Sequence, residues 1–508
     1  MARGTVRPAK DLCSDCGLCD SRWVAYVRQA CAFIHQQFES LERKAHGRSR
    51  DLDNEDELYF GVSERMFCAQ LQQPLEGAQW TGIVSTLGVR ALEQNLVDAV
   101  LCVQQSPDDR FTPMPVLART PQEVLAARVN KPTLSNNLSV LEQLPGSGIK
   151  RLLAIGVGCQ TQALRAVQDS LGLEELYVLG MPCVDNVSRE GLQTFLESTS
   201  RSPETVVHYE FMQDFRIHFR HSDGSTETVP FFGLDTPKLK DVFAPSCLSC
   251  FDYVNACADL VVGYMGAPFQ WQWLVVRNQR GQKLLDLVEA ELKTQPVMSS
   301  GQRAQAVQQG IDAYDKALRL PRWLAEVVGV VVQRVGPKGL EYARFSIDSH
   351  FTRNATWLRR HHPEKLAQHL PAFAQKIVSR YRLPQPSAKR SMPHIIPTKA
   401  ASKTLFVIDM VWNGGTTIET EALAWSDTPD PANEFACKLW GQQWGFEHGL
   451  DPAPTMRTTP GEVPVRSIAS ASTHCAEAHS PLAERPQCVQ AHALARAACS
   501  GAHTHSKC

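Results

Sequence analysis

The middle of the chain alternates between apolar runs and amphipathic segments. The runs at 97–103, 150–155 and 176–179 predict buried strands. Helices are predicted from residue 82 to about residue 95, and from the capping box Thr120-Pro-Gln-Glu123 to about residue 128. Strands joined through helices run parallel, so this pattern predicts a mixed α/β fold.

The alternation of apolar and polar residues changes after residue 200. Thr205–Phe232 follows a period of two and predicts an antiparallel extension, with a hairpin turn at 222–225. A strand at Trp271–Arg277 and a helix at Lys283–Lys293 are predicted next. Residues 322–335 are unusually apolar but too short to span a bilayer. For them we rank a core helix before a subunit interface and a shallow membrane contact.

The two ends of the chain follow other patterns. Apolar residues at helical intervals predict a helix at Trp23–Ile34, and the many Arg, Asp and Glu residues of 40–60 predict an exposed, charged connector. Beyond about Leu383 the composition shifts to Ala, Pro, Thr, Ser, His and Cys without periodicity, which predicts a disordered tail. The predicted parts are an N-terminal segment with its connector at 1–75, an α/β domain at 76–200, a C-terminal domain at 201–383 and a low-complexity tail at 384–508.

Composition narrows the class of protein. The chain has 508 residues, a formal net charge of −1 and a pI near 7.0, so no bulk charge attracts nucleic acid. Its 16 cysteines are too sparse for a disulfide scaffold and indicate a reducing compartment. The first residues carry no apolar signal segment, and the stretch before Cys13 is too short for a transit peptide. If the protein works in a plastid, its presequence is missing from this chain.

Three cysteines separated by two-residue gaps, Cys13, Cys16 and Cys19, stand near the start of the chain, and Cys31 follows shortly after. The spacing is close to the bacterial ferredoxin run, in which thiolates converge on an iron–sulfur cluster. Zinc is the alternative, although three cysteines this close together crowd a tetrahedral ion. Buried, inert cysteines are the third interpretation.

Four further cysteines come together by topology. Cys159 and Cys183 each follow the carboxyl end of a predicted strand, and parallel strands place such ends at one edge of a sheet. Cys247 and Cys250 form a CxxC pair and complete a second set of four. Eight such cysteines fit two 4Fe–4S clusters, while Cys31 could serve either cluster, as in two-cluster ferredoxins.

Two polar segments of the α/β domain could hold a phosphorylated cofactor. A helix start with small and hydroxyl residues leaves backbone N–H groups free for a phosphate, although an ordinary helix start looks the same. A following polar loop carries one cation and several hydroxyl and amide groups, and it fits a pyrophosphate or a simple turn. The candidate ligands are Gly82, Ser85, Thr86, Asn130, Lys131, Thr133 and Ser135.

Six longer segments carry a resemblance to a known family. They are Cys13–Asp20, Glu76–Ser85, Lys131–Ser135, Tyr209–Asp214, Pro245–Tyr253 and Gly336–Arg344. Through them the chain from Cys13 to Leu383 resembles the flavin and iron–sulfur family of the deazaflavin-reducing hydrogenase beta subunit, in its plant and cyanobacterial chlorophyll branch. Residues 384–508 depart from that family.

The resemblance implies the cofactors, partners and reaction. It implies FAD and two 4Fe–4S clusters, with a ferredoxin-like iron–sulfur segment at 1–75 and a flavin-binding domain at 76–200. Reduced ferredoxin would be the electron donor and a chlorophyll-type tetrapyrrole the substrate. His46–Phe60 and the short Gly266–Leu274 resemble members that reduce the 8-vinyl group of divinyl chlorophyllide or protochlorophyllide to ethyl. Reduction of 7-hydroxymethyl chlorophyll a and a pure electron-transfer subunit are the alternatives.

Sequence identifies no proton donor, and Lys131, Asp252 and Tyr253 are candidates only by their neighbourhood. We expect a plastid stroma or thylakoid-surface location in a eukaryote and a cytoplasmic one in a cyanobacterium. A peripheral thylakoid contact and a homo-oligomer are further expectations.

Overall fold

The computed structural model describes residues 9–236, 238–239, 241–313 and 320–384, together with three short strands further on. These strands are β14 (Leu405–Asp409), β15 (Glu421–Ala424) and β16 (His492–Ala493), which pair antiparallel. The chain divides into two compact units, Met1–Pro386 and Ser387–Cys508. Apart from these strands, the disordered tail predicted for 384–508 lies outside the described residues.

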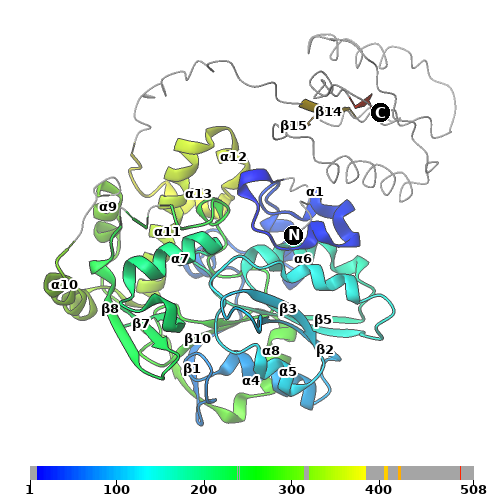
Figure 1. Cartoon of the computed structure of the whole chain (residues 1–508), viewed down its shortest axis with the longest axis horizontal. Helices are drawn as coiled ribbons and strands as arrows, with labels where there is room; N and C mark the ends of the chain where they lie inside the picture. The colour runs from blue at the N-terminus through cyan, green and yellow to red at the C-terminus, as the bar shows by residue number, and fades with distance from the viewer. Residues whose placement is uncertain are drawn as a thin grey trace, which may run out of the picture. The chain divides into compact units, whose positions relative to one another are not determined.

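An eight-stranded mixed sheet organises the first unit (Figure 1). Its spatial order is β11 (Leu292–Pro296), β1 (Arg65–Leu71), β10 (Gln272–Val276), β9 (Leu260–Gly263), β5 (Glu175–Gly180), β4 (Arg151–Gly156), β2 (Ala99–Gln105) and β3 (Pro113–Ala118). The four strands β9, β5, β4 and β2 are parallel, and the pairs on either side are antiparallel. The predicted mixed α/β fold is therefore confirmed.

Helices cover both faces of this sheet, because its central strands are apolar on both sides. One face packs against α4 (Ile83–Glu93), α5 (Pro121–Ala126) and α8 (Gln279–Asp286). The other packs against α1 (Val27–Ala30), α2 (Phe38–His46), α6 (Gly158–Val167), α11 (Leu340–His361) and α13 (Ala372–Val378).

The remaining elements lie outside the large sheet. A three-stranded antiparallel sheet contains β6 (Val206–Phe211), β7 (Arg216–His221) and β8 (Thr226–Pro230). The others are α3 (Glu55–Phe60), α7 (Arg189–Thr199), α9 (Ala304–Asp312), α10 (Arg322–Val335), α12 (Leu366–His369), β12 (Ser299–Ser300) and β13 (Lys338–Gly339). The antiparallel extension and the turn between β7 and β8 match the sequence prediction.

Local sequence patterns predicted several helices and strands correctly. The Thr120 side chain accepts from the Glu123 backbone N–H and the Glu123 carboxylate accepts in return from Thr120, so the predicted capping box forms. The strands β2, β4, β5 and β10 lie within two residues of their predicted bounds. Strong helix caps and long apolar runs are the patterns that tertiary packing rarely overrides.

Two helix predictions were wrong. Trp23–Ile34 forms only a 3-10 turn at Arg22–Tyr26 and the single turn α1, because the backbone of Cys31 is extended and ends the helix. The helix predicted at Lys283–Lys293 starts earlier, at the cap Asn278, and gives way to the strand β11. Pairing with β1 holds β11 in the sheet, which local helical periodicity does not reveal.

The charged connector predicted at 40–60 is also corrected by the structure. It contains the helices α2 and α3, and its charges are partly buried. The Glu42 and Arg50 side chains form an ion pair at 1% and 4% exposure. The Arg50 guanidinium also stacks over the Phe373 ring at 3.7 Å. The charge-rich segment 40–60 is therefore packed against the rest of the unit, because its buried Glu42 and Arg50 neutralise each other.

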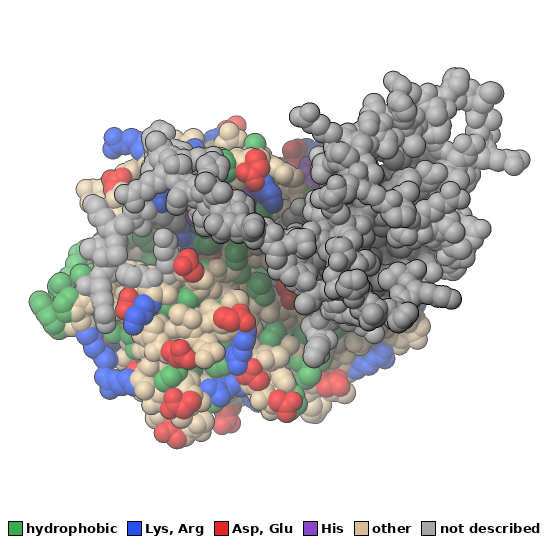
Figure 2. Space-filling view, turned by 45° about the horizontal axis from the view of Figure 1, so that its top comes forward, with side chains coloured by type: hydrophobic (Ala, Val, Ile, Leu, Met, Phe, Trp, Pro, Cys, Tyr) green, Lys and Arg blue, Asp and Glu red, His purple; other side chains and the backbone are tan. Residues whose placement is uncertain are grey.

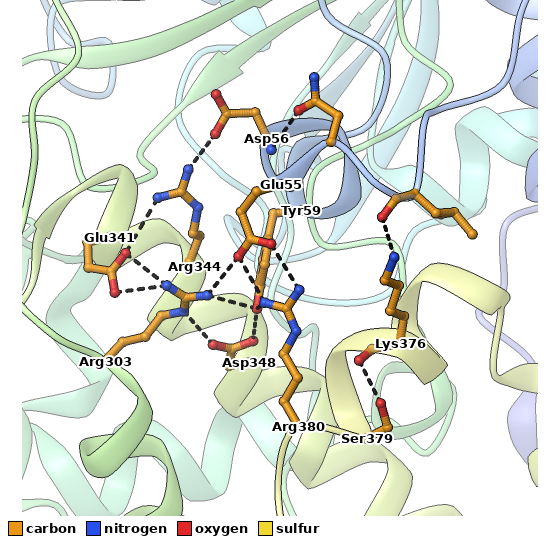
Figure 3. A network of polar contacts seen from close by, with 12 residues as sticks. Glu55, Asp56, Tyr59, Arg303, Glu341, Arg344, Asp348, Lys376, Ser379 and Arg380 are labelled. Carbon is orange, nitrogen blue, oxygen red and sulfur yellow. Dashed lines mark hydrogen bonds and ion pairs between the residues drawn. The ribbon is translucent and has the colours of Figure 1, made fainter.

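A polar network joins α3 to α11 and to the chain near α13 (Figure 3). At its centre the fully buried Asp348 carboxylate accepts from the hydroxyls of Tyr59 at 2.7 Å and Tyr381 at 2.6 Å. Arg303 bridges Asp348 and Glu341, at 2.7 and 2.8 Å. The network ties the N-terminal part of the first unit to its C-terminal end.

Candidate functional site

The carboxyl ends of β2, β4, β5 and β9 lie at the same edge of the large sheet, because these strands are parallel. β1 ends there too, since it is antiparallel to β10 and β10 is antiparallel to β9. The register places Gly156 of β4 beside Gly180 of β5. Cys159 and Cys183, which follow these two glycines, therefore start from neighbouring strand ends, as predicted.

The second group of cysteines is built around this edge. Cys159 lies in the first turn of α6 and Cys183 follows β5. Cys247 begins a short 3-10 turn, and Cys250 directly follows it. The Asn186 backbone N–H donates to the Cys247 Sγ at 3.3 Å, and that of Asp252 donates to the Cys250 Sγ at 3.4 Å. Backbone donors of this kind stabilise anionic sulfur and tune iron–sulfur clusters.

Cys13, Cys16 and Cys19 of the first group lie in the N-terminal loop, and Cys31 follows α1, which packs against α6 (Figure 1). Gly17 has a left-handed φ of 91°, and a Cβ there would lie 2.4 Å from the Asn136 carbonyl oxygen. Only glycine therefore fits at this point of the cysteine loop. The Asp15 backbone N–H donates to the Cys13 Sγ at 3.3 Å, which repeats the N–H to sulfur bonds of the second group.

Burial raises the pKa values of six of these cysteines, and neighbouring thiols add to the effect for all of them but Cys247: Cys16, Cys31, Cys159, Cys183, Cys247 and Cys250. For Cys183 burial acts first, followed by the negative charge that Cys247, Cys159 and Cys250 would carry as thiolates. Burial likewise raises the pKa of Cys247 to about 11. Burial also raises the pKa of Cys31, with a further contribution from Cys13. The thiols of each group thus lie close enough to repel one another as anions.

The two groups are neighbours. The pKa of Cys16 is raised by burial and then by Cys159 of the other group, before Cys31 and Cys19 of its own. Cys13, Cys31, Cys159 and Cys250 all pack against the small apolar cluster of Ala9, Leu12 and Phe33. Two redox centres held at these positions would be adjacent, as one-electron transfer between them requires.

The donors of both groups are cysteine thiols, which are the ligands that iron–sulfur clusters take. In the described part of the chain, no three His, Cys, Asp or Glu side chains converge closely enough to hold one ion. A cubane spreads its four ligands over four irons, so its thiolates lie farther apart than those of zinc. Positive iron would also offset the repulsion among buried thiolates. The assignment of Cys13, Cys16, Cys19, Cys31, Cys159, Cys183, Cys247 and Cys250 as ligands stays a prediction.

The helix start proposed for a phosphate lies at the same sheet edge, after β1. Gly82 caps α4 with a left-handed φ of 91°, and a Cβ there would lie 2.7 Å from that of Leu75. The Thr86 hydroxyl donates to the Gly82 carbonyl at 3.1 Å, and Ser85 is half-buried in the same turn. The first backbone N–H groups of α4 have no partner within the helix by geometry, which leaves donors for an anion.

The polar loop after α5 uses most of its side chains internally. The Lys131 ammonium donates to the carbonyls of Ala127, Arg128 and Val129 at 2.8–3.0 Å, at the carboxyl end of α5. Thr133 donates to the Phe111 carbonyl, and Ser135 donates to Asn137. Asn130 is exposed. Phosphate binding by these four side chains stays a prediction. To bind a phosphate, the Lys131 ammonium would have to leave the carboxyl end of α5, which it caps.

The three candidate proton donors have different environments. Burial lowers the pKa of Lys131 to about 8. Asp252 is 2% exposed, accepts from the Gln162 amide and the Ala256 N–H, and has a pKa raised by burial. Tyr253 is buried against the His350 ring at 5.5 Å, and burial raises its pKa. Asp252 and Tyr253 therefore help to hold the second cysteine group. The backbone N–H of Cys183, a member of that group, donates to the Tyr253 carbonyl at 3.0 Å.

Sequence reasoning missed the helix that holds the second cysteine group. The Asn354 amide of α11 donates to the carbonyls of Cys247 at 2.8 Å and Cys250 at 2.7 Å. Arg353 forms a bidentate ion pair with Asp185 at 2.8 Å. No motif of the sequence marks this helix in advance, although five of its polar residues are nearly fully buried: Asp348, His350, Thr352, Asn354 and Thr356.

The same sheet edge carries a run of aromatic rings. Tyr264 directly follows β9, and its ring lies 6.4 Å from Trp80 and 6.0 Å from Tyr342. The Trp80 N–H is buried without a hydrogen-bond partner. Flat rings and one unpaired donor suit a planar, conjugated ligand such as a flavin or a tetrapyrrole.

Comparisons with known proteins show which family the chain resembles. Residues 66–142 match the family profile described as "Coenzyme F420 hydrogenase/dehydrogenase, beta subunit N-term", and residues 149–300 match the corresponding C terminus profile. An uncharacterized protein of Nostoc sp. is 69% identical over 379 residues, which cover 75% of this chain and 96% of that protein. The chloroplastic 7-hydroxymethyl chlorophyll a reductase of Oryza sativa is 51% identical over 397 residues, covering 74% and 84%.

More distant relatives come from archaea. The coenzyme F420 hydrogenase subunit beta of Methanococcus voltae is 29% identical over 227 residues, which cover 42% of this chain and 77% of that one. Among solved structures, a chain of the F420-reducing NiFe hydrogenase complex from Methanosarcina barkeri matches with a TM-score of 0.43 and 25% identity. It covers 54% of this chain and 91% of that chain.

Proposed function

Because this chain belongs to the family of coenzyme F420 hydrogenase and dehydrogenase beta subunits, we propose that it is an oxidoreductase of chlorophyll metabolism. In this proposal the two cysteine groups would hold two 4Fe–4S clusters that accept electrons from reduced ferredoxin, and a bound FAD would supply the reducing equivalents for a chlorophyll-type tetrapyrrole. The observation that carries the proposal is the gathering of eight cysteines in two adjacent groups at one sheet edge.

The chain's own residues have definite tasks in this proposal. The two cysteine groups hold the clusters, and the backbone N–H groups at Asp15, Asn186 and Asp252 stabilise sulfur charge. The start of α4 offers N–H donors to the flavin phosphates. The clusters transfer single electrons, and a flavin stores two and delivers a hydride. Trp80, Tyr264 and Tyr342 form an apolar wall against which a macrocycle can lie.

The preferred substrate is the 8-vinyl group of divinyl chlorophyllide or protochlorophyllide, reduced to ethyl. The support is the resemblance of His46–Phe60 and Gly266–Leu274 to vinyl-reducing members of the family. The second segment connects β9 to β10 beside Tyr264, at the edge where the substrate would lie. Adding a hydride and a proton across a conjugated double bond requires no leaving group.

Reduction of 7-hydroxymethyl chlorophyll a is the second candidate, and the 51% identity to the rice reductase of that name favours it. This reaction must expel a hydroxyl group and needs an acid at that oxygen. Both substrates share one ring system, so a flat apolar pocket separates them by only about 1–3 kcal/mol for one small group.

One assay distinguishes these functions. Purified protein receives ferredoxin and its reductase, with divinyl protochlorophyllide in one reaction and 7-hydroxymethyl chlorophyll a in another. We expect conversion of the vinyl group to ethyl, with a weaker reaction on the second pigment at most. Turnover of the hydroxymethyl pigment alone would promote the second candidate. Turnover of neither pigment without a further subunit would assign the chain to electron transfer.

The cofactors have a separate test. Anaerobically purified protein should contain about eight iron atoms and one FAD per chain, and Cys247→Ser should lose about half of the iron. Cys102→Ala is the matched control, since Cys102 is buried in β2 away from both groups. Full iron retention in Cys247→Ser, or equal loss in Cys102→Ala, would reject the ligand set.

The location follows from the relatives. The rice protein is named chloroplastic and the Nostoc protein comes from a cyanobacterium, so we place this reductase in a plastid or in a cyanobacterial cytoplasm.

A further inference from the structure

The helix α10 exposes a stripe of large apolar side chains, and the predicted core helix at 322–335 is therefore wrong. The stripe consists of Trp323, Val327, Val330, Val331 and Val335. Trp323 is 68% and Val335 76% exposed, although such side chains are normally buried. Figure 2 shows hydrophobic side chains gathered at the left edge of the molecule, where α10 lies.

The stripe is continuous along the helix. Its members recur at intervals of three, four and seven residues, which places them on one side of an α-helix. The opposite side is buried at Ala325 and Gly329, which pack toward Gly233 and Phe215. The helix is thus fastened to the small sheet by one face and presents an apolar face outward. A contiguous exposed apolar face of this kind marks an interaction surface.

The exposed charged side chains of the helix segment itself are all positive. From Arg322 to Lys338 the exposed charged residues are Arg322, Arg334 and Lys338. Glu326 is the single acid of the segment, and its carboxylate is paired with Arg216 at 2.6 Å. The outward face of α10 therefore combines apolar surface with positive charge that no acid among the described residues pairs.

We propose that α10 docks the protein on a lipid bilayer that carries anionic lipids. The helix would lie flat in the interface, with the apolar stripe among the acyl chains. Arg322 and Lys338 would lie at the headgroups, and the long side chain of Arg334, which starts within the arc of the exposed valines, would extend to them. At 14 residues it is about 21 Å long, too short to cross the hydrocarbon core. No helix in the described part of the chain is long and apolar enough to span a membrane. Trp323 suits the interface, where indole rings concentrate.

Charge favours lipid over a second copy of this chain. A two-fold pairing of the stripe would bury Arg334 of each copy in the contact, because Arg334 lies within the arc of the exposed valines. The segment offers no unpaired acid to compensate, since Glu326 is held by Arg216. An anionic surface satisfies the same arginine and lysine side chains.

Flotation of the full chain with vesicles tests the proposal. One set of vesicles is phosphatidylcholine alone, and the other is equimolar phosphatidylcholine and phosphatidylglycerol. We expect the wild type to float with the anionic vesicles, and high salt to weaken this binding. Val327→Glu combined with Val331→Glu should weaken it at least about tenfold, since two carboxylates would enter the apolar layer and repel the headgroups.

Met114→Glu is the matched control, because Met114 is also an exposed apolar residue but lies on the edge strand β3. It should float like the wild type, and unchanged unfolding midpoints would show that both variants are folded. Equal binding to neutral vesicles, no binding to either kind, or undiminished binding of the double variant would overturn the proposal. A wild-type oligomer that the double variant dissociates, without flotation, would assign the stripe to a second copy instead.

Discussion

At the scale of single residues, the two ring nitrogens of His46 both find suitable hydrogen-bond partners only when the ring is neutral. Its Nε2 lies 2.9 Å from the Ala256 carbonyl and its Nδ1 lies 3.0 Å from the Asn278 amide nitrogen. A neutral ring donates to the carbonyl and accepts from the amide, whereas a protonated ring would have to donate at both positions. Burial, and then the positive charge of Arg277, lower the pKa of His46 to about 4. Asp259 opposes this shift and Arg165 adds to it.

His46 should therefore make the fold sensitive to acid. Below pH 6.5 His46 binds a proton in the unfolded chain but stays neutral in the folded chain. The free energy of unfolding therefore decreases as the pH falls from 6.5 toward about 4. By pH 5 this amounts to about 2 kcal/mol. We expect His46→Gln, whose amide can donate to Ala256 and accept from Asn278, to show a shallower loss.

Urea unfolding at pH 7.5, 6.5 and 5.5 measures the two slopes. The variants should have similar free energies of unfolding at pH 7.5, where His46 is neutral in both states. Parallel slopes for the wild type and His46→Gln would show that this histidine does not contribute to the acid sensitivity.

At the scale of elements, the network between α3, α11 and α13 contains both a buried and a more exposed ion pair, which can be compared (Figure 3). Arg303 is 15% exposed and is bonded to the fully buried Asp348. Arg380 is 35% exposed and pairs with the half-exposed Glu55 at 2.8 Å. A partner lost from a buried pair leaves a desolvated charge behind, whereas water replaces a partner lost from a surface pair.

Arg303→Met should therefore lower the free energy of unfolding by about 3–5 kcal/mol, because the Asp348 carboxylate would keep only two hydroxyl donors. Arg380→Met is the matched control and should cost no more than about 1 kcal/mol. Urea denaturation of both variants at neutral pH measures the difference. Equal losses would mean that burial of Asp348 does not decide the strength of the network.

At the scale of the whole molecule, the large sheet unites distant parts of the first unit. β1, from the N-terminal range 1–75, lies between β10 and β11, which come from the range 201–383. The strands β2, β4 and β5 of the range 76–200 complete the same sheet. Loops from all three ranges consequently meet at one edge, where the cysteines and the start of α4 lie.

Much of this edge could be predicted from the sequence. Parallel strands follow from the strand–helix alternation, and the positions of Cys159 and Cys183 follow from those strands. The ferredoxin-like spacing singled out Cys13, Cys16, Cys19 and Cys31. The supporting residues could not be predicted in this way. Asn354 lies 104 residues beyond Cys250 along the chain and has no motif of its own.

The sequence by itself determined the features that depend on neighbours along the chain. These are the helix caps, the apolar strands, the cysteine spacings and the family resemblance, because local backbone geometry and short-range bonding specify them. Only the tertiary structure decided which charges of residues 40–60 are buried, where β11 pairs and which face of α10 is exposed. Each of these features depends on a partner that is distant in sequence, such as β1 for β11. The local pattern of apolar and polar residues does not indicate which segment that partner is.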